Sequence, residues 1–152
     1  MGMFDALDIS ATGLSAQRYR MDIIAENVAN ANTTRTENGG IYRRKVVTFE
    51  AKGDNGQSFS SILGTSSASL SGVIGDGVRI TRVKEDTTSD VKKAYDPAHP
   101  DADENGYVTY PNVDIITEMT NLIDASRAYE ANATIVDGTK SMLQTGLSIA
   151  KN

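Results

Sequence analysis

The chain has no cysteine, no tryptophan and a single histidine among its 152 residues. Without cysteine it forms no disulfide and offers no thiolate as a nucleophile or as a metal ligand. The one histidine, His99, stands between Pro97 and Pro100, and no nucleophile motif accompanies it, as a Ser-His-acid triad would require. An enzyme that uses His99 is therefore the weakest of the functional hypotheses, and we expect the protein not to be an enzyme.

Long apolar runs are also missing. No run approaches the roughly 18 residues of a membrane span, and the first residues, MGMFDALD, lack the basic start of a secretory signal. The formal net charge of -5 disfavours a nucleic-acid surface, and no GxxxxGK[ST] phosphate loop occurs. We expect no nucleic-acid partner, no insertion into a membrane and no cofactor.

What the sequence does contain is a seven-residue apolar repeat near each end. Repeats of this spacing form the seam between packed helices. They predict two long terminal helices that pack as an antiparallel, coiled-coil-like pair. The seam residues, which we expect to form an assembly interface, are Leu7, Leu14, Met21 and Val28 near the N-terminus, and Ile115, Leu122, Tyr129, Val136 and Leu143 after Pro111.

The C-terminal helix carries a second apolar line at another angle, made of Ala128, Ile135, Met142 and Ile149. A soluble helix normally keeps one apolar stripe for its own core and leaves the rest polar. One partner cannot cover both lines, so we expect the second neighbour to be another subunit. Asn112 and Asp114 are suitable capping residues for this helix, and Glu118 adds negative charge near its start.

Between the helices the pattern changes to that of an α+β protein. Residues 41–50 and 77–84 are rich in β-branched side chains and predict strands, whereas 53–77 hold six Gly and seven Ser and predict a loop. All three prolines fall in an extended arm over 95–111. We therefore expect a β-rich middle domain over 36–110, and an assembly core of helices over 1–35 and 111–152.

The arm contains a partial calcium-loop motif. Asp101, Asp103, Asn105 and Gly106 match the opening D-x-D-x-N-G of such a loop, but Asn112 stands where the bidentate Glu is required. A solvated acidic turn is the preferred interpretation. A cation-binding adhesion or interaction module centred on this DADENG loop is the alternative.

Charge is unevenly distributed along the middle of the chain. Residues 35–52 hold five basic and two acidic side chains, a net of +3, whereas residues 85–104 hold seven acidic and two basic ones, a net of -5. Isolated exposed ion pairs contribute little to stability, so solvated surface is the simpler interpretation. A contact between the two regions in different subunits is the other.

Three motifs together resemble a known family. A seam-forming helix that runs into ENVANANTT and then YRRK is similar to the rod and hook family of axial proteins of the bacterial flagellum. YDPAHPDADENGYVTYPNVD, followed by EMTNLIDASRAYEAN, resembles a proximal rod subunit of the basal body. The resemblance covers about residues 3–50 and 78–150.

The resemblance implies a structural function. It implies a subunit that polymerises through its terminal helices to help form the drive shaft and export channel of the flagellum. The location it implies is the basal body, in the cell envelope and periplasmic space, reached through the flagellar type III export apparatus without a cleaved signal. The partners it implies are the rod proteins FlgB, FlgF and FlgG, the export-gate adaptor FliE, and further copies of the chain itself.

The same resemblance assigns a role to the polar segment that follows the first helix. It implies that this segment turns the chain out of the helical core. Asn and Thr side chains bond to backbone groups at helix ends, and Asn tolerates left-handed backbone angles, so these residue types suit such a turn. The residues of this chain-turn motif are Asn27, Asn30, Asn32 and Thr33.

Overall fold

The structure is a computed structural model, and it describes residues 3–37, 39–52 and 77–150. Its elements are, in chain order, α1 (Met3–Ala29), β1 (Lys45–Ala51), β2 (Val78–Glu85), β3 (Lys92–Tyr95), β4 (Tyr107–Tyr110) and α3 (Ile115–Ala150). Two long terminal helices with a small set of antiparallel strands between them confirm the α+β prediction. The predicted Gly/Ser loop lies, apart from Gly77, outside the described residues.

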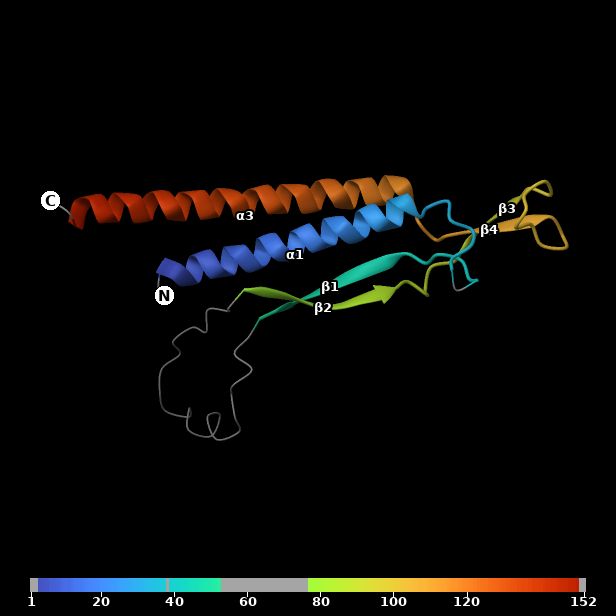
Figure 1. Cartoon of the computed structure of the whole chain (residues 1–152), viewed down its shortest axis with the longest axis horizontal. Coiled ribbons are helices and arrows are strands. Elements are labelled where there is room, and N and C mark those ends of the chain that lie inside the picture. Colours follow the sequence, from blue (N-terminus) through green and yellow to red (C-terminus); the bar gives the residue numbers. More distant parts are fainter. Residues whose placement is uncertain (1–2, 38, 53–76, 151–152) are drawn as a thin grey trace, which may run out of the picture.

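The two helices pack side by side and run in opposite directions, with both chain ends at the same end of the molecule (Figure 1). A Cβ atom placed on Gly13 would lie 3.0 Å from Nδ2 of Asn132, and the Asn27 side chain reaches Glu118. These two contacts are separated by the same number of residues on each helix, so the register is kept between them. The prediction of an antiparallel pair is confirmed.

A two-stranded ribbon of β1 and β2 covers α1 on the side away from α3 (Figure 1). Val47 pairs with Val83 and Phe49 pairs with Ile80, and all four side chains are half-buried. The register shifts between Thr48 and Phe49. The shift inserts one extra residue into β2, which lets both inward pairs face α1.

Gly77, directly before β2, is the point at which the ribbon approaches α1 closely. Its φ is +103°, a left-handed value that favours glycine, and a Cβ atom there would lie 2.2 Å from Oγ1 of Thr12. The same Oγ1 accepts a hydrogen bond from the backbone N–H of Val78 at 3.1 Å. A side chain at position 77 would therefore push the ribbon away from the helix.

Strands β3 and β4 form a separate hairpin beyond the end of the helix pair (Figure 1). The rings of Tyr95 and Tyr107 pack edge to face across it, with centroids 5.3 Å apart. The sequence predicts an extended, turn-rich arm here but not this strand pairing, because four-residue strands are too short for a periodic signal. The first predicted strand also begins later than expected, at Lys45 rather than at residue 41.

The buried apolar core is small and lies where α1, α3 and the first residues before β1 meet. Ala31, Tyr42 and Val113 form its one cluster among the described residues. Ala16 on α1 and Ala125 on α3 are also buried. No helix in the described part of the chain combines the length and apolar content that crossing a membrane requires.

Candidate functional site

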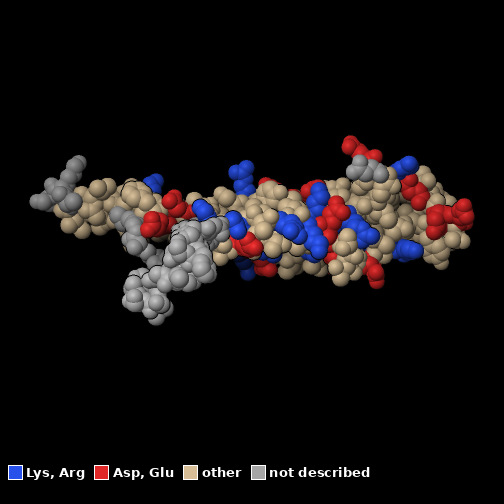
Figure 2. Space-filling model, turned by 90° about the horizontal axis from the view of Figure 1, so that it is seen from below, with Lys and Arg blue, Asp and Glu red and all other residues tan. Residues whose placement is uncertain are grey.

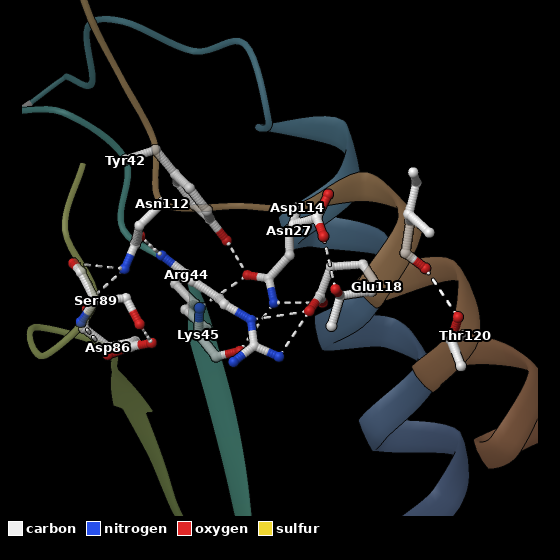
Figure 3. Close-up of polar contacts among 12 residues, drawn as sticks. Asn27, Tyr42, Arg44, Lys45, Asp86, Ser89, Asn112, Asp114, Glu118 and Thr120 are labelled. Carbon is white, nitrogen blue, oxygen red and sulfur yellow. Dashed lines mark hydrogen bonds and ion pairs between the residues drawn. The ribbon is translucent and has the colours of Figure 1, made fainter. Parts of the chain in front are cut away.

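The last turn of α1 carries a buried asparagine that joins three elements. Asn27 is 1% exposed. Its Nδ2 donates to the Lys45 carbonyl at 2.9 Å and to Oε2 of Glu118 at 3.0 Å. Its Oδ1 accepts from the Tyr42 hydroxyl at 2.9 Å and from the Lys45 N–H at 2.8 Å (Figure 3). An amide has two donors and two acceptor lone pairs, so every hydrogen-bonding position of Asn27 is used.

Glu118 brings α3 into the same network. It is 1% exposed, and its Oε1 accepts from Nε and Nη2 of Arg44 at 2.8 and 2.7 Å (Figure 3). Removing a carboxylate from water is costly unless a counter-charge and hydrogen bonds compensate, and Arg44 and Asn27 supply both. The sequence predicts Glu118 only as a charge near the helix start. Its partners lie 74 and 91 positions away in the chain, so no local pattern marks it.

Asn112 has a different role from the one predicted. Its Oδ1 accepts from the Arg44 N–H at 2.9 Å, and its Nδ2 donates to the Asp86 carbonyl at 2.9 Å. It therefore links the segment before α3 to the residues at one end of the ribbon, Arg44 just before β1 and Asp86 just after β2. Asp114 caps the helix, because its carboxylate interacts with the backbone N–H groups of Ile116 and Thr117 in the first turn, and its Oδ2 also accepts from the Thr117 hydroxyl at 2.7 Å. That bond, more than any other contact, lowers the pKa of Asp114 below its usual range.

Tyr42 is a neutral donor in this network. The pKa of the Tyr42 hydroxyl is raised to about 12. The largest cause is burial of the side chain, which removes it from water, and the negative charges of Glu26, Glu118 and Glu85 contribute less. A raised pKa keeps the hydroxyl proton in place to bond Asn27. Lys45 forms an ion pair with Glu26 beside it.

The other residues of the chain-turn motif lie where α1 ends. Nδ2 of Asn30 donates to the Glu26 carbonyl at 2.9 Å, and the Thr33 hydroxyl donates to Oδ1 of Asn30 at 3.1 Å. These bonds occupy a backbone acceptor of the last helical turn. Asn32 is exposed. The motif thus divides into a buried network member, Asn27, two residues that close the helix end, and one that faces solvent.

The predicted assembly residues are neither fully buried nor uniformly exposed. The four on α1, Leu7, Leu14, Met21 and Val28, are half-buried. On α3, Ile115, Leu122 and Tyr129 are 43%, 37% and 36% exposed. Val136 and Leu143 are half-buried. The structure therefore places this apolar line at the edge of the contact between the helices rather than at its centre.

The centre of the contact is made by smaller and more polar residues, which the sequence analysis missed. On α3 they follow a seven-residue line of their own, and three of them are buried. Small side chains let two helix backbones approach closely, as Gly13 does opposite Asn132. These residues also recur every seven positions, but the spacing does not stand out in the sequence because Ala125 is the only apolar residue of the four. The line consists of Glu118, Ala125, Asn132 and Thr139.

Other large apolar side chains of α3 are exposed. A run of large apolar side chains exposed along one helix is uncommon on a protein that stays alone. It includes Ile116, at 77% exposed, and Ile123, at 53%. We call this set the outer face of α3. Its members are Ile116, Met119, Ile123, Ile135, Met142 and Ile149.

The acidic loop of the hairpin is held by its own hydrogen bonds. Oδ1 of Asp103 accepts from the N–H groups of Asn105 and Tyr107 at 2.9 and 2.8 Å, and Oδ2 of Asp101 accepts from the Thr34 hydroxyl at 2.8 Å. Nδ1 of His99 accepts from the Asp101 N–H. Within the described ranges, no group of three His, Cys, Asp or Glu side chains could hold a metal ion. The alternative of a cation-binding module gains no support.

Comparisons with known proteins agree with this arrangement of helices and turn motif. Residues 7–35 match the family model described as "Flagella basal body rod protein", and residues 104–149 match that of the "Flagellar basal body rod FlgEFG protein C-terminal". The first match covers most of α1 and the turn that follows it, and the second covers the end of the hairpin tip, β4 and nearly all of α3.

Curated relatives match over nearly the whole chain. The chain is 47% identical to the flagellar basal-body rod protein FlgC of Bacillus subtilis, over 99% of this chain and 100% of that protein. It is 42% identical to FlgC of Borreliella burgdorferi over 98% of each, and 34% identical to FlgC of Salmonella typhimurium over 99% of this chain and 100% of that one. The chain therefore belongs to the FlgC family of flagellar basal-body rod proteins.

Proposed function

We propose that this chain is a structural subunit of the proximal rod, which polymerises through its terminal helices to help form the drive shaft and the export channel. The observation that carries the proposal is the outer face of α3. Burying each large apolar side chain of this face against a neighbour is worth roughly 1.5–3 kcal/mol. The small and polar seam between α1 and α3 leaves those side chains uncovered within the single chain.

Several further parts of the function belong to the same proposal. The assembly core comprises 1–35 and 111–152, and the middle domain, 36–110, lies further out. The partners are copies of the chain, the rod proteins FlgB, FlgF and FlgG, and the adaptor FliE. The protein leaves the cytoplasm through the flagellar type III apparatus and works in the cell envelope as part of the basal body, without catalysing a reaction. Membership of a family of named rod proteins supports these statements.

A single substitution on the outer face tests the proposal. Ile123→Asp removes an apolar contact and adds a carboxylate that would have to lose its water when a neighbour packs there. Because Ile123 is 53% exposed in the single chain, the fold itself should lose little stability. We expect a normally folded and exported chain that fails to enter the rod, so that cells lacking the native gene stay without filaments.

The adjacent exposed residue supplies a matched control. Asp124→Asn changes the neighbouring position of α3 without touching an apolar side chain and should restore motility. Circular dichroism of both purified variants would show whether either loses helix. Wild-type motility with a folded Ile123→Asp chain would show that this face is not an assembly interface.

A further inference from the structure

The outward-facing side of the ribbon is basic. Cross-strand partners in an antiparallel ribbon share a face, and Lys84, Arg82 and Arg79 pair with Val46, Thr48 and Glu50, all six of them exposed. In the part of the chain that the structure describes, only Arg79 has a carboxylate partner there, Glu50 at 3.1 Å. Among the described residues, Arg82 and Lys84 form no ion pair. We call this the basic face of the ribbon.

The tip of the β3–β4 hairpin has the opposite charge. Between β3 and β4, residues 96–106 contain Asp96, Asp101, Asp103 and Glu104 and no Lys or Arg. All four carboxylates are exposed, and the hydrogen bonds that they accept within the described residues come from backbone N–H groups and one hydroxyl. Within the described residues, none of the four forms an ion pair.

The two charged regions do not meet within one chain. The ribbon lies along the middle of α1, whereas the hairpin extends beyond the end of the helix pair (Figure 1). Figure 2, which views the molecule from the ribbon side, shows Lys and Arg over the middle of this face, interspersed with some acidic side chains, and Asp and Glu at the hairpin end. A charge that has no partner among the described residues is available to a neighbour.

We propose that the acidic hairpin tip of one copy docks on the basic face of the ribbon of a second copy. The occupant is a second copy because the complementary charges are both on this chain. The contact joins two different surfaces, so it is heterologous, and repeating it produces a ring or a helical array rather than a closed pair. This inference rests on the proposed function, since it assigns one lateral contact within the rod.

The contact sets orientation more than affinity. Exposed ion pairs are individually weak and are screened by salt, whereas complementary fields steer encounters and fix register. The outer face of α3 supplies most of the binding free energy in this scheme. The charges select which copy orientation reaches that face.

The absence of cysteine makes a direct test possible. Thr48→Cys places a thiol on the basic face beside Arg82, and Asn105→Cys places one at the hairpin tip, and neither removes a charge. The two full-length chains are co-expressed in cells that lack the native gene, and isolated basal bodies are mildly oxidised. We expect a disulfide between one Thr48→Cys chain and one Asn105→Cys chain, and little dimer when either variant is expressed alone.

Charge reversal then separates electrostatic docking from chance proximity. Arg82→Glu with Lys84→Glu, in the Thr48→Cys chain, should lower the yield of mixed disulfide about tenfold, because two attractions become repulsions. Asp101→Lys with Glu104→Lys, in the Asn105→Cys chain, should restore it. If the yield of mixed disulfide is the same with and without the charge reversals, the proposal is overturned. A disulfide between two Thr48→Cys chains in place of the mixed disulfide would overturn it as well.

The test also distinguishes the two proposals. If the cysteine variants support motility but give no mixed disulfide, the docking inference is wrong and the rod function stands. A different outcome would contradict the rod function itself: both cysteine variants fold normally, but neither they nor the native chain enter the basal body. In that case the docking inference is wrong as well.

Discussion

At the scale of single residues, the side chain of one asparagine holds three parts of the chain together. Asn27 contacts the segment before β1, the first strand and α3 through four hydrogen bonds. Two of its partners, Glu118 and Tyr42, are buried, and without Asn27 their polar groups would lose a hydrogen bond while remaining shielded from water. The cost of an unmade buried bond exceeds the net gain from making it, so the network is sensitive to truncation.

The change Asn27→Ala should lower the free energy of unfolding by about 2–4 kcal/mol, because Glu118, Tyr42 and Lys45 each lose a partner. Urea denaturation followed by circular dichroism measures it. Asn32→Ala is the matched control from the same motif, and its exposed side chain should change stability by less than about 0.5 kcal/mol. Equal effects from both variants would show that the network does not stabilise the fold.

The hydroxyl of Tyr42 makes stability depend on alkaline pH. Its pKa is raised from 10.0 to about 12, so the folded chain holds this proton more tightly than the unfolded chain does. The stability that the protonated Tyr42 hydroxyl gives to the folded state is fully present below about pH 10, and it is lost as the pH rises towards about 12. Tyr42→Phe should remove this part of the pH dependence.

Nuclear magnetic resonance of the tyrosine rings gives a direct measurement. The Tyr42 ring should titrate at about pH 12 rather than at the ordinary tyrosine pKa of 10.0. Titration of Tyr42 at the ordinary value would contradict its buried position.

At the scale of elements, the ribbon depends on one glycine for its close approach to α1. Gly77 combines a left-handed φ with an approach to Thr12 that leaves no room for a Cβ atom. Gly138, within α3, has nothing within 4 Å of its Cβ position. The same residue type is therefore required at one position and unfavourable at the other.

Gly77→Ala should destabilise the fold by about 2 kcal/mol or more, from the backbone strain and from the clash with Thr12. Gly138→Ala, its matched control, should stabilise the helix by about 0.5–1 kcal/mol. Thermal unfolding of the two variants compares them. A Gly77→Ala chain that melts at or above the wild-type temperature would show that the ribbon does not need this contact.

At the scale of the whole molecule, the helix pair is unequal in length. The last turns of α3 extend past the start of α1, and Leu147 and Ile149 there are exposed (Figure 1). Ala125, by contrast, is fully buried between the helices. Local stability should therefore decline along α3 towards its C-terminal end.

Hydrogen exchange of the isolated chain should show this decline. Amides around Ala125 should exchange at least about tenfold more slowly than those around Leu147, because helix ends without tertiary contacts open more readily. In assembled rods we expect the difference to shrink as neighbours cover the end of α3. Uniform protection along α3 of the isolated chain would contradict the expected gradient.

The sequence by itself determined the two helices, their antiparallel pairing and the family. Heptad spacing is a local property that survives without knowledge of the fold, and ENVANANTT and YDPAHPDADENG are contiguous motifs. Asp114 as a cap was also predictable, since capping depends on the residues that immediately follow. Asn112 was not, because its side chain bonds Arg44 and Asp86, which are distant in the chain.

Only the tertiary structure decided which residues lie between the helices and which face outward. Apolar periodicity predicts that Leu122 and Tyr129 belong to a seam, yet Ala125 and Glu118 are the buried residues there. Two helices pack most closely where their side chains are small, and the Arg44 guanidinium compensates the charge of Glu118 only because the fold brings it within 2.7 Å. Periodicity identifies a helical face, but the partner's shape and charge decide which face is buried.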